Sequence, residues 1–281
     1  MSDQQPNVRI SLASRPENVA LLREAVVGIA ESVALGGAVE DVKAAVSEAA
    51  NNVVMHAYPD GEGPMEVELA LAPHELHVVV RDHGVGIGPR LVGPGDDGRG
   101  IGLAVIEALT SRMELRAHAP TGLEVSMWFA VPEGRRLEGF GVVAAAPAPA
   151  ADDGSGLSIT VAPAALSAPL AGRVLVALGA RAGFSIDRLS DLQLLADALG
   201  ATLERSLDGT AVTLAAAGGR RRLELHVGPL RGGAAEGVLA RAAVAGVGPV
   251  IERLVDSVAV ASDGVAERLV LVIAEARPGA A

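Results

Sequence analysis

The spacing of apolar residues in the first half of the chain changes several times, and this order limits the folds that the chain can adopt. Val8, Ile10 and Leu12 alternate as in a half-buried strand. Two segments with helical spacing follow: Val19, Leu22, Val26, Ile29 and Val33, then Val39, Val42, Val46, Ala50 and Val53. Next come strand-like 65–71 and 75–81, a helical pattern at 105–113, and strand-like 114–118 and 123–129. Because strands arrive in adjacent pairs with helices between them, we predict a two-layer α/β (α+β) sandwich.

The second half repeats this outline in weaker form. Strand-like 159–161, helix-like 170–180 and 186–199, and strand-like 211–215 and 222–227 follow in the same order. The sequence V-I-E-A-L at 105–109 also returns as V-I-E-R-L at 250–254, at the corresponding point in the order. We therefore expect a duplicated fold. In the first half, Ser14 and Glu17 have the spacing of a capping box and predict the start of the first helix.

Residues 144–156 are rich in Pro, Ala, Gly and acidic residues and have no hydrophobic period, which is typical of a solvated linker. A structureless loop of this length is uncommon inside a compact domain. We predict a first domain at 1–137, a linker at 138–156 and a second domain at 157–281. Half of the residues are hydrophobic but only 2% are aromatic, so both cores must be aliphatic.

Composition excludes several classes of function. The net charge of −11 would repel nucleic acid and anionic membranes, and the few aromatic residues offer no base-stacking surface. The N-terminus has no signal-peptide pattern, and no apolar stretch approaches the roughly 20 residues that span a bilayer. The chain has no cysteine, which excludes disulfides and thiolate metal sites. We expect a cytoplasmic protein that binds neither nucleic acid nor membranes.

Three polar residues of the second predicted helix, Glu48, Asn52 and His56, are spaced by four and would share one face of an α-helix. A carboxylate can act as a general base. An amide oxygen suits Mg²⁺, which completes its shell with phosphate and water. The same spacing also describes an ordinary solvated helix face, so this motif does not decide alone.

Two glycine-rich segments follow. The first, 82–86, begins with an acid, Asp82, at the end of a strand, where it can accept a hydrogen bond from a ligand amine while the glycines admit a planar ring. The second, 98–103, leads into a helix, and backbone amides at a helix N-terminus bind phosphate. Arg99 adds a positive charge there. Each segment is also compatible with a plain glycine-rich turn.

Rival sites lack essential parts. Lys43 is the only lysine and lies in a predicted helix, which excludes a P-loop and the protein-kinase fold. The glycines of 93–98 fit G-x-G-x-x-G but follow a loop, whereas a dinucleotide fold requires a preceding strand. His74 and His77 would point to opposite faces of a strand, which disfavours zinc.

Taken together and in this order, the three segments resemble the boxes of the GHKL ATPases, which have the Bergerat or histidine-kinase-like ATPase fold. Residues 46–58 resemble the N box, 82–86 the G1 box and 98–103 the G2 box. Within that superfamily, the motif S-E-A-x-x-N-x-x-x-H-A-Y and the short lid segment resemble those of the anti-sigma-factor serine kinases of the RsbW and SpoIIAB type. The resemblance covers residues 8 to 131.

The resemblance implies an ATP site with Mg²⁺ at the matching positions. Glu48 would be the general base, Asn52 the Mg²⁺ ligand and Asp82 the acceptor for the adenine amino group. The other matching residues would shape the base pocket or close over the phosphates: Gly84, Gly86, Gly98, Arg99, Gly100, Gly102 and Leu103.

The function implied by the resemblance is that of an ATP-dependent protein serine/threonine kinase that regulates transcription. Its substrate would be an anti-sigma-factor antagonist of the STAS fold, and a sigma factor would be a second partner. The alternative is a non-catalytic module in which ATP sets the conformation that sequesters a partner. The intact Glu48 favours the enzyme, because a pure clamp needs no base.

The second half departs from this pattern. Aligning Asp197 with Glu48 places Ala201 where Asn52 stands, and the strand 223–227 runs into Gly228, Pro229 and Leu230 without an aspartate. Only 246–248 is similar to the third box. We expect a degenerate copy that has lost the nucleotide and that occupies the place of a second protomer in an intramolecular pseudo-dimer.

Overall fold

The computed structural model describes residues 6–32, 35–86, 101–118, 120–131, 156–164, 167–244 and 248–275. The chain divides into two compact units, Met1–Phe140 and Gly141–Ala281. Of the predicted linker 138–156, only Gly156 belongs to the described residues.

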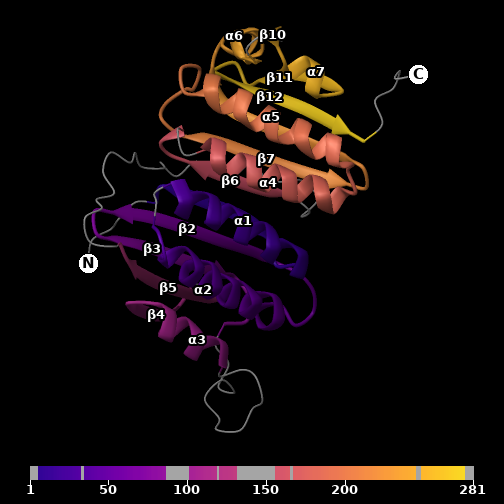
Figure 1. The fold of residues 1–281 in the computed structure, drawn as a ribbon. Helices are drawn as coiled ribbons and strands as arrows, with labels where there is room; N and C mark the ends of the chain where they lie inside the picture. The colour runs from indigo at the N-terminus through magenta and orange to yellow at the C-terminus, as the bar shows by residue number, and fades with distance from the viewer. Residues whose placement is uncertain are drawn as a thin grey trace. The chain divides into compact units, whose positions relative to one another are not determined.

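The first unit is a two-layer α/β sandwich, as predicted. Its elements are β1 (Val8–Ala13), α1 (Pro16–Ser32), α2 (Ala38–Asn52), the short π-helix η1 (Val53–Ala57), β2 (Pro64–Ala72), β3 (Glu75–Asp82), α3 (Ile101–Leu109), β4 (Arg112–Ala117) and β5 (Leu123–Ala130). The strands form an antiparallel sheet in the order β1-β2-β3-β5-β4. The helices lie on one face of this sheet (Figure 1).

The core of this unit is built from apolar residues that recur with strand spacing in the sheet and with helical spacing in the helices. Alternate residues of β1, such as Val8 and Ile10, are fully buried, as are Leu22, Val26 and Ile29 along one stripe of α1. Burying each such side chain stabilises the fold by about 1.5–3 kcal/mol. The sheet and helices therefore share one aliphatic layer.

The start of α1 differs from the predicted capping box. The helix begins at Pro16, whose fixed φ suits the first helical position. The Ser14 hydroxyl instead accepts a hydrogen bond from Gly63 N at 3.0 Å, and Ser14 N donates to Gly63 O at 2.8 Å. Ser14 therefore joins the end of β1 to the segment that leads into β2.

The face of the sheet opposite the helices carries a row of ion pairs. Glu68 on β2 binds Arg9 and Arg81, both at 2.7 Å, and Arg81 also binds Glu124 at 2.6 Å. Burial alone would raise the pKa of Glu68, but the charge of Arg81 and the hydrogen bonds from both arginines hold that pKa below its ordinary value.

Beside these ion pairs, Trp128 on β5 lies between two partners. The ring of His77 stacks on it with centroids 4.2 Å apart, and the guanidinium carbon of Arg112 lies 3.7 Å from the Trp128 ring centroid. Burial, with a smaller contribution from the charge of Arg112, lowers the pKa of His77. His77 therefore packs within the sheet against Trp128.

The second unit has the same order of main elements. They are β6 (Leu157–Val161), α4 (Ser167–Ala182), α5 (Ile186–Leu203), β7 (Val212–Gly219), β8 (Arg222–Arg231), α6 (Ala235–Arg241), β9 (Ala243–Val244), β10 (Gly248–Pro249), α7 (Ile251–Leu254), β11 (Ser257–Ser262) and β12 (Ala266–Ala274). The five long strands have the order β6-β7-β8-β12-β11, which matches that of the first unit position by position. Helices α4 and α5 cover one face of their strands (Figure 1).

The strand registers of the two units also agree. Val8 faces Leu69 in the first unit, and Leu157 faces Ala216 in the second. The repeated segments 105–109 and 250–254 end where α3 and α7 end, and each is followed after two residues by the edge strand, β4 or β11. The sequence match therefore lies at the same point in the order of elements of the two units.

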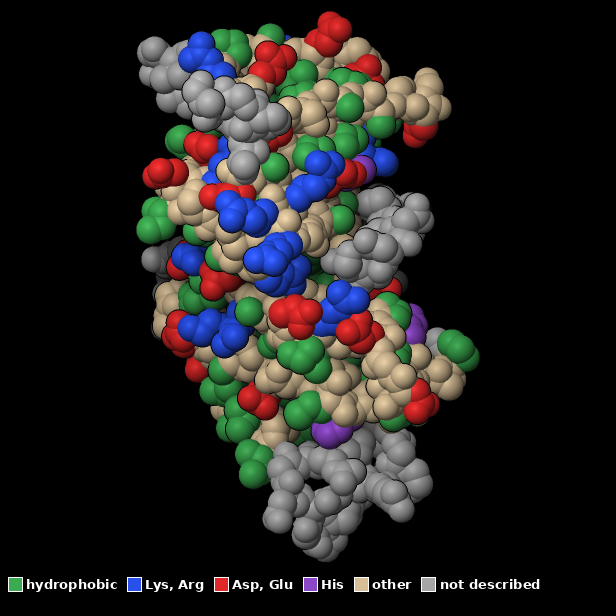
Figure 2. Space-filling model, turned by 90° about the vertical axis from the view of Figure 1, so that its right-hand side faces the viewer, with side chains coloured by type: hydrophobic (Ala, Val, Ile, Leu, Met, Phe, Trp, Pro, Cys, Tyr) green, Lys and Arg blue, Asp and Glu red, His purple; other side chains and the backbone are tan. Residues whose placement is uncertain are grey.

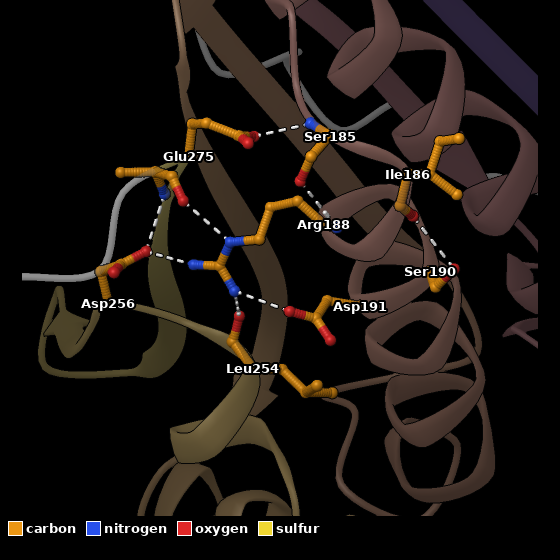
Figure 3. Close-up of polar contacts among 9 residues, drawn as sticks. Ser185, Ile186, Arg188, Ser190, Asp191, Leu254, Asp256 and Glu275 are labelled. Atoms are coloured by element: carbon orange, nitrogen blue, oxygen red, sulfur yellow. Dashed lines mark hydrogen bonds and ion pairs between the residues drawn. The ribbon is translucent and has the colours of Figure 1, made fainter. Parts of the chain in front are cut away.

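A buried arginine joins three elements of the second unit (Figure 3). Arg188, in the first turn of α5, donates to Ala274 O and Leu254 O, each at 2.8 Å. It also forms ion pairs with Asp191 at 2.9 Å and with Asp256 at 2.5 Å. Removing one partner would leave an uncompensated buried charge, which is costly.

Acidic and basic side chains are interspersed on the face drawn in Figure 2, with hydrophobic side chains scattered among them. The net negative charge is therefore not gathered into one acidic field on that face. Within the described ranges, no helix has the length and apolar character required to cross a membrane.

Candidate functional site

Glu48 and Asn52 lie one turn apart near the end of α2 and face the first turn of α3. A Cβ built on Gly102 would lie 3.2 Å from Glu48 Oε2 and 3.3 Å from Asn52 Oδ1. The buried stripe of α2, which includes Val42, Val46 and Ala49, leaves these two polar side chains half-buried at the border of the core. The structure thus brings a carboxylate, an amide oxygen and a helix N-terminus together.

The helix that carries these residues changes its winding directly after Asn52. Residues Val53–Ala57 form a π-helix, so the prediction of a continuous α-helix through His56 is wrong. The wider turn breaks the four-residue spacing on which the shared face was based, and the His56 side chain is exposed. Such π-helical turns occur frequently at functional sites.

Asp82 ends β3 as a buried carboxylate, with 3% of its surface exposed. Its Oδ1 accepts hydrogen bonds from Gly84 N at 2.9 Å and from Leu123 N at 3.3 Å. Buried carboxylates require such partners, because an unpaired buried charge is costly. The two bonds fix the carboxylate at the end of the strand.

Two glycines are required around Asp82. A Cβ on Gly84 would lie 2.0 Å from Ala57 O, so no other residue fits against the end of η1. Gly122 has φ +129°, and a Cβ on it would lie 2.2 Å from Asp82 O. Because the backbone passes so closely around the Asp82 carboxylate, only glycine fits at these two positions.

The remaining predicted site residues are distributed unequally. Gly86 follows Gly84 in the same loop, and Gly102 and Leu103 lie in the first turn of α3. Gly98, Arg99 and Gly100 lie outside the described residues. The structure therefore groups Glu48 and Asn52 with Gly102, and Asp82 with the loop glycines.

Sequence reasoning gave no role to four residues that shape this loop. The carbonyl of Ala57 accepts a hydrogen bond from Val85 N at 2.9 Å, and the Tyr58 hydroxyl accepts one from His83 N at 2.9 Å. Gly122 and Leu123 contact Asp82 from the start of β5. The only sequence signals were the H-A-Y end of the N-box-like segment and a glycine just before the last strand.

The second unit has different side chains at the corresponding places. The register of β8 against β12 shifts by one residue between Glu267 and Leu269, so that fully buried Leu230 takes the inward position that Asp82 has in the first unit. On α5, Asp197 is exposed and accepts a hydrogen bond from Gln193 at 3.0 Å. Ala201 offers no metal ligand.

In this unit, a carboxylate from β12 accepts a hydrogen bond from a backbone amide that follows β8. Glu267 Oε2 accepts a hydrogen bond from Ala235 N at 2.9 Å. Backbone hydrogen bonds, first from Ala235 and next from Gly233, hold the pKa of Glu267 below its ordinary value. The loop after β8 thus binds an internal anion. Of the 246–248 segment that is similar to a third box, only Gly248, at the start of β10, is described.

Comparison with known proteins agrees with the geometry of the first unit. Residues 12–129 match the histidine kinase-like ATPase domain family. The serine-protein kinases RsbW of Bacillus thuringiensis (strain Al Hakam) and Bacillus cereus (strain 03BB102) are each 28% identical over 128 residues, which cover 41% of this chain and 80% of each relative. RsbW of Bacillus anthracis (strain CDC 684 / NRRL 3495) is 30% identical over 86 residues, 30% of this chain and 54% of the relative. Residues 12–129 of the first unit are therefore similar to histidine-kinase-like ATPase domains, and the similarity to the RsbW serine-protein kinases supports the GHKL anti-sigma-factor kinase type.

Proposed function

We propose that the first unit binds one Mg-ATP and transfers its γ-phosphoryl group to a serine or threonine of a protein partner. The observation that carries this proposal is the convergence of Glu48, Asn52 and Gly102. A hard oxygen ligand and a carboxylate lie at the N-terminus of α3, where backbone amides favour phosphate. Asn52 Oδ1 would hold Mg²⁺, which completes its shell with phosphate oxygens and water.

Asp82 would recognise the base. Both of its hydrogen bonds from the backbone reach Oδ1, and its other oxygen would accept the adenine amino group. The close backbone packing of Gly84 against Ala57 and of Gly122 against Asp82 would hold this carboxylate in place for the base. A guanine would present a carbonyl oxygen where adenine presents the amine, so the site should discriminate against GTP.

Glu48 would act as the general base of the transfer. As the hydroxyl oxygen of the acceptor attacks the γ-phosphorus, the bond from that phosphorus to the bridging oxygen breaks, and Glu48 takes the hydroxyl proton. When bound, Mg-ATP would supply the phosphoryl group, ADP would be the leaving group, and Mg²⁺ would neutralise charge on the phosphates. Gly102 keeps the space between Glu48 and α3 free of a side chain.

The partners are proposed from the resemblance and from the name of the relatives, which are serine-protein kinases. The acceptor would be an anti-sigma-factor antagonist of the STAS fold, and a sigma factor would be the second partner. The second unit, with Leu230 and Ala201 at the key places, would bind no nucleotide. It would take the place of a second protomer.

The test is a phosphotransfer assay with the full chain, γ-labelled ATP, Mg²⁺ and STAS-fold proteins from the native source. Label on a serine or threonine that depends on Glu48 would support the proposal. If no label is transferred and no ATP is hydrolysed, while ATP still changes partner binding, the chain is the non-catalytic clamp. If ATP neither binds nor acts, the proposal fails.

A further inference from the structure

Three successive backbone amides fix the loop that follows Asp82. The amide of His83 donates to the Tyr58 hydroxyl at 2.9 Å, that of Gly84 to Asp82 Oδ1 at 2.9 Å, and that of Val85 to Ala57 O at 2.9 Å. The bond to the carboxylate is therefore flanked on both sides by anchors at the end of η1. Two of the three acceptors, Ala57 O and the Tyr58 hydroxyl, lie in the segment that follows α2, the helix that carries the two predicted site residues.

Of these anchors, only that of Tyr58 comes from a side chain outside the loop. Its hydroxyl accepts from His83 N and donates to Pro64 O at 2.6 Å, so both of its hydrogen-bonding functions are in use. Its ring lies against Gly63, where a Cβ would stand 2.1 Å from Cε1. Gly63 is bound in turn to Ser14 through two hydrogen bonds. The hydroxyl is thus held from both sides before any ligand arrives.

We propose that Tyr58 is a positioning residue for base recognition: its hydroxyl holds the His83–Val85 backbone so that Asp82 presents its free oxygen to adenine. This inference rests on the proposed ATP site and extends it to the origin of base selectivity. It also connects the two halves of the site, because η1 joins the helix of the Mg²⁺ ligand Asn52 to the loop of Asp82. Tyr58 itself need not touch the nucleotide.

The expected effect is that of one lost hydrogen bond. Tyr58→Phe keeps the ring on Gly63 and removes only the hydroxyl, which leaves the amide of His83 without its acceptor. The loop then samples conformations in which Asp82 is misaligned, and affinity for ATP should fall by about 5–20-fold. Affinity for GTP, which lacks the amine, should change less, so the ratio of the two affinities should fall.

A matched control exists in the same unit. The Ser111 hydroxyl donates to Trp128 O at 2.8 Å, outside the loop, so Ser111→Ala also removes one side-chain hydroxyl bond. Calorimetry of the full chain with Mg-ATP and Mg-GTP should show a loss of selectivity in Tyr58→Phe and wild-type selectivity in Ser111→Ala. Amide exchange at residues 83–85, measured without nucleotide, should be faster only in Tyr58→Phe. Equal selectivity and equal exchange in the two variants would overturn the proposal.

A further measurement needs no substitution. Tyr58 is the only tyrosine of the chain, so fluorotyrosine gives one ¹⁹F signal from this site even if Tyr58→Phe folds poorly. The signal should shift when Mg-ATP is added and should shift less with Mg-GTP. An unmoved signal at saturating ATP would contradict a coupled loop. If wild type binds neither nucleotide, the ATP proposal fails, and amide exchange still shows whether Tyr58 holds the loop.

Discussion

Gly102 lies so close to Asn52 that a Cβ on it would stand 3.3 Å from the Asn52 amide oxygen, nearer than most such contacts in proteins. This separation decides what Gly102→Ala should do. Alanine favours a helix by about 1 kcal/mol over glycine, so α3 should not lose stability. The added methyl group would nevertheless displace Asn52 and Glu48 from the space that phosphate and Mg²⁺ require.

We therefore expect Gly102→Ala to weaken Mg-ATP binding by about tenfold without lowering the melting temperature, since the methyl group would displace the Glu48 and Asn52 oxygens by a few tenths of an ångström and fill space beside them. Gly37→Ala is a suitable control, because a Cβ there meets nothing within 4 Å. Calorimetry and thermal unfolding of both variants measure the two quantities. Unchanged ATP affinity in Gly102→Ala would separate α3 from the site.

Alanine substitutions of Glu48 and Asn52 should have different effects on nucleotide binding and turnover, although the two side chains are neighbours. Glu48→Ala should keep ATP affinity and lose hydrolysis or transfer by about two to four orders of magnitude, the range for a positioned base. Asn52→Ala should lose Mg²⁺-dependent binding itself. Nucleotide binding measured with and without Mg²⁺, together with turnover, distinguishes the two roles. If both variants lose binding equally, Glu48 is not solely a base.

The sequence predicted the main elements of the first unit because its apolar spacing is regular. Only the resemblance to the GHKL boxes grouped Glu48 and Asn52 with Gly102, because the spacing of residues along one helix does not indicate which other helix it faces. The sequence did not predict η1. A π-turn depends on what its end contacts, here Val85 and His83 in a loop more than twenty positions away. The role of Gly122 was missed for the same reason, since its close approach to Asp82 is a contact between distant segments.

In the second unit the outline was predicted, but the extension of β8 to Arg231 and the contact of Glu267 with the loop were not. Leu230 shows why. A leucine after Gly-Pro gives no sign in the sequence that it fills the place of a carboxylate, and only the strand register reveals it. The Arg188 network was equally invisible, because its partners come from α5, α7 and β12.

Arg188 should be the most sensitive polar residue of the second unit. Arg188→Met would leave Asp256 buried near Asp191 without a cation and should destabilise this unit by about 3–5 kcal/mol. Arg222→Ala removes an exposed pair with Glu224 at 3.8 Å and should cost at most about 1 kcal/mol. Denaturant unfolding of both variants provides the comparison. Equal midpoints would show that the buried network contributes nothing.

The titration of Tyr58 offers a pH test of its environment. Burial raises the pKa of the Tyr58 hydroxyl above its usual value; the hydrogen bond from His83 N opposes this shift, and the charges of Asp82 and Glu66 add to it. The neutral form is favoured in the folded state, so this contribution to stability is complete below the unfolded pKa and is lost as pH rises through the folded pKa. Ultraviolet titration reads this single tyrosine directly. An ordinary pKa, or a lowered one, would be inconsistent with the burial of this hydroxyl close to Asp82 and Glu66.

The most direct test of the account is the number of ATP molecules bound by the intact chain and its dependence on Asp82. Isothermal calorimetry with Mg-ATP should give one site per chain, and Asp82→Asn, which exchanges a carboxylate for an amide of nearly the same volume, should abolish most of the affinity while the melting temperature changes little. Two sites per chain would contradict the assignment of Leu230 and Ala201 as losses in the second unit. Wild-type affinity in Asp82→Asn would contradict the nucleotide site itself.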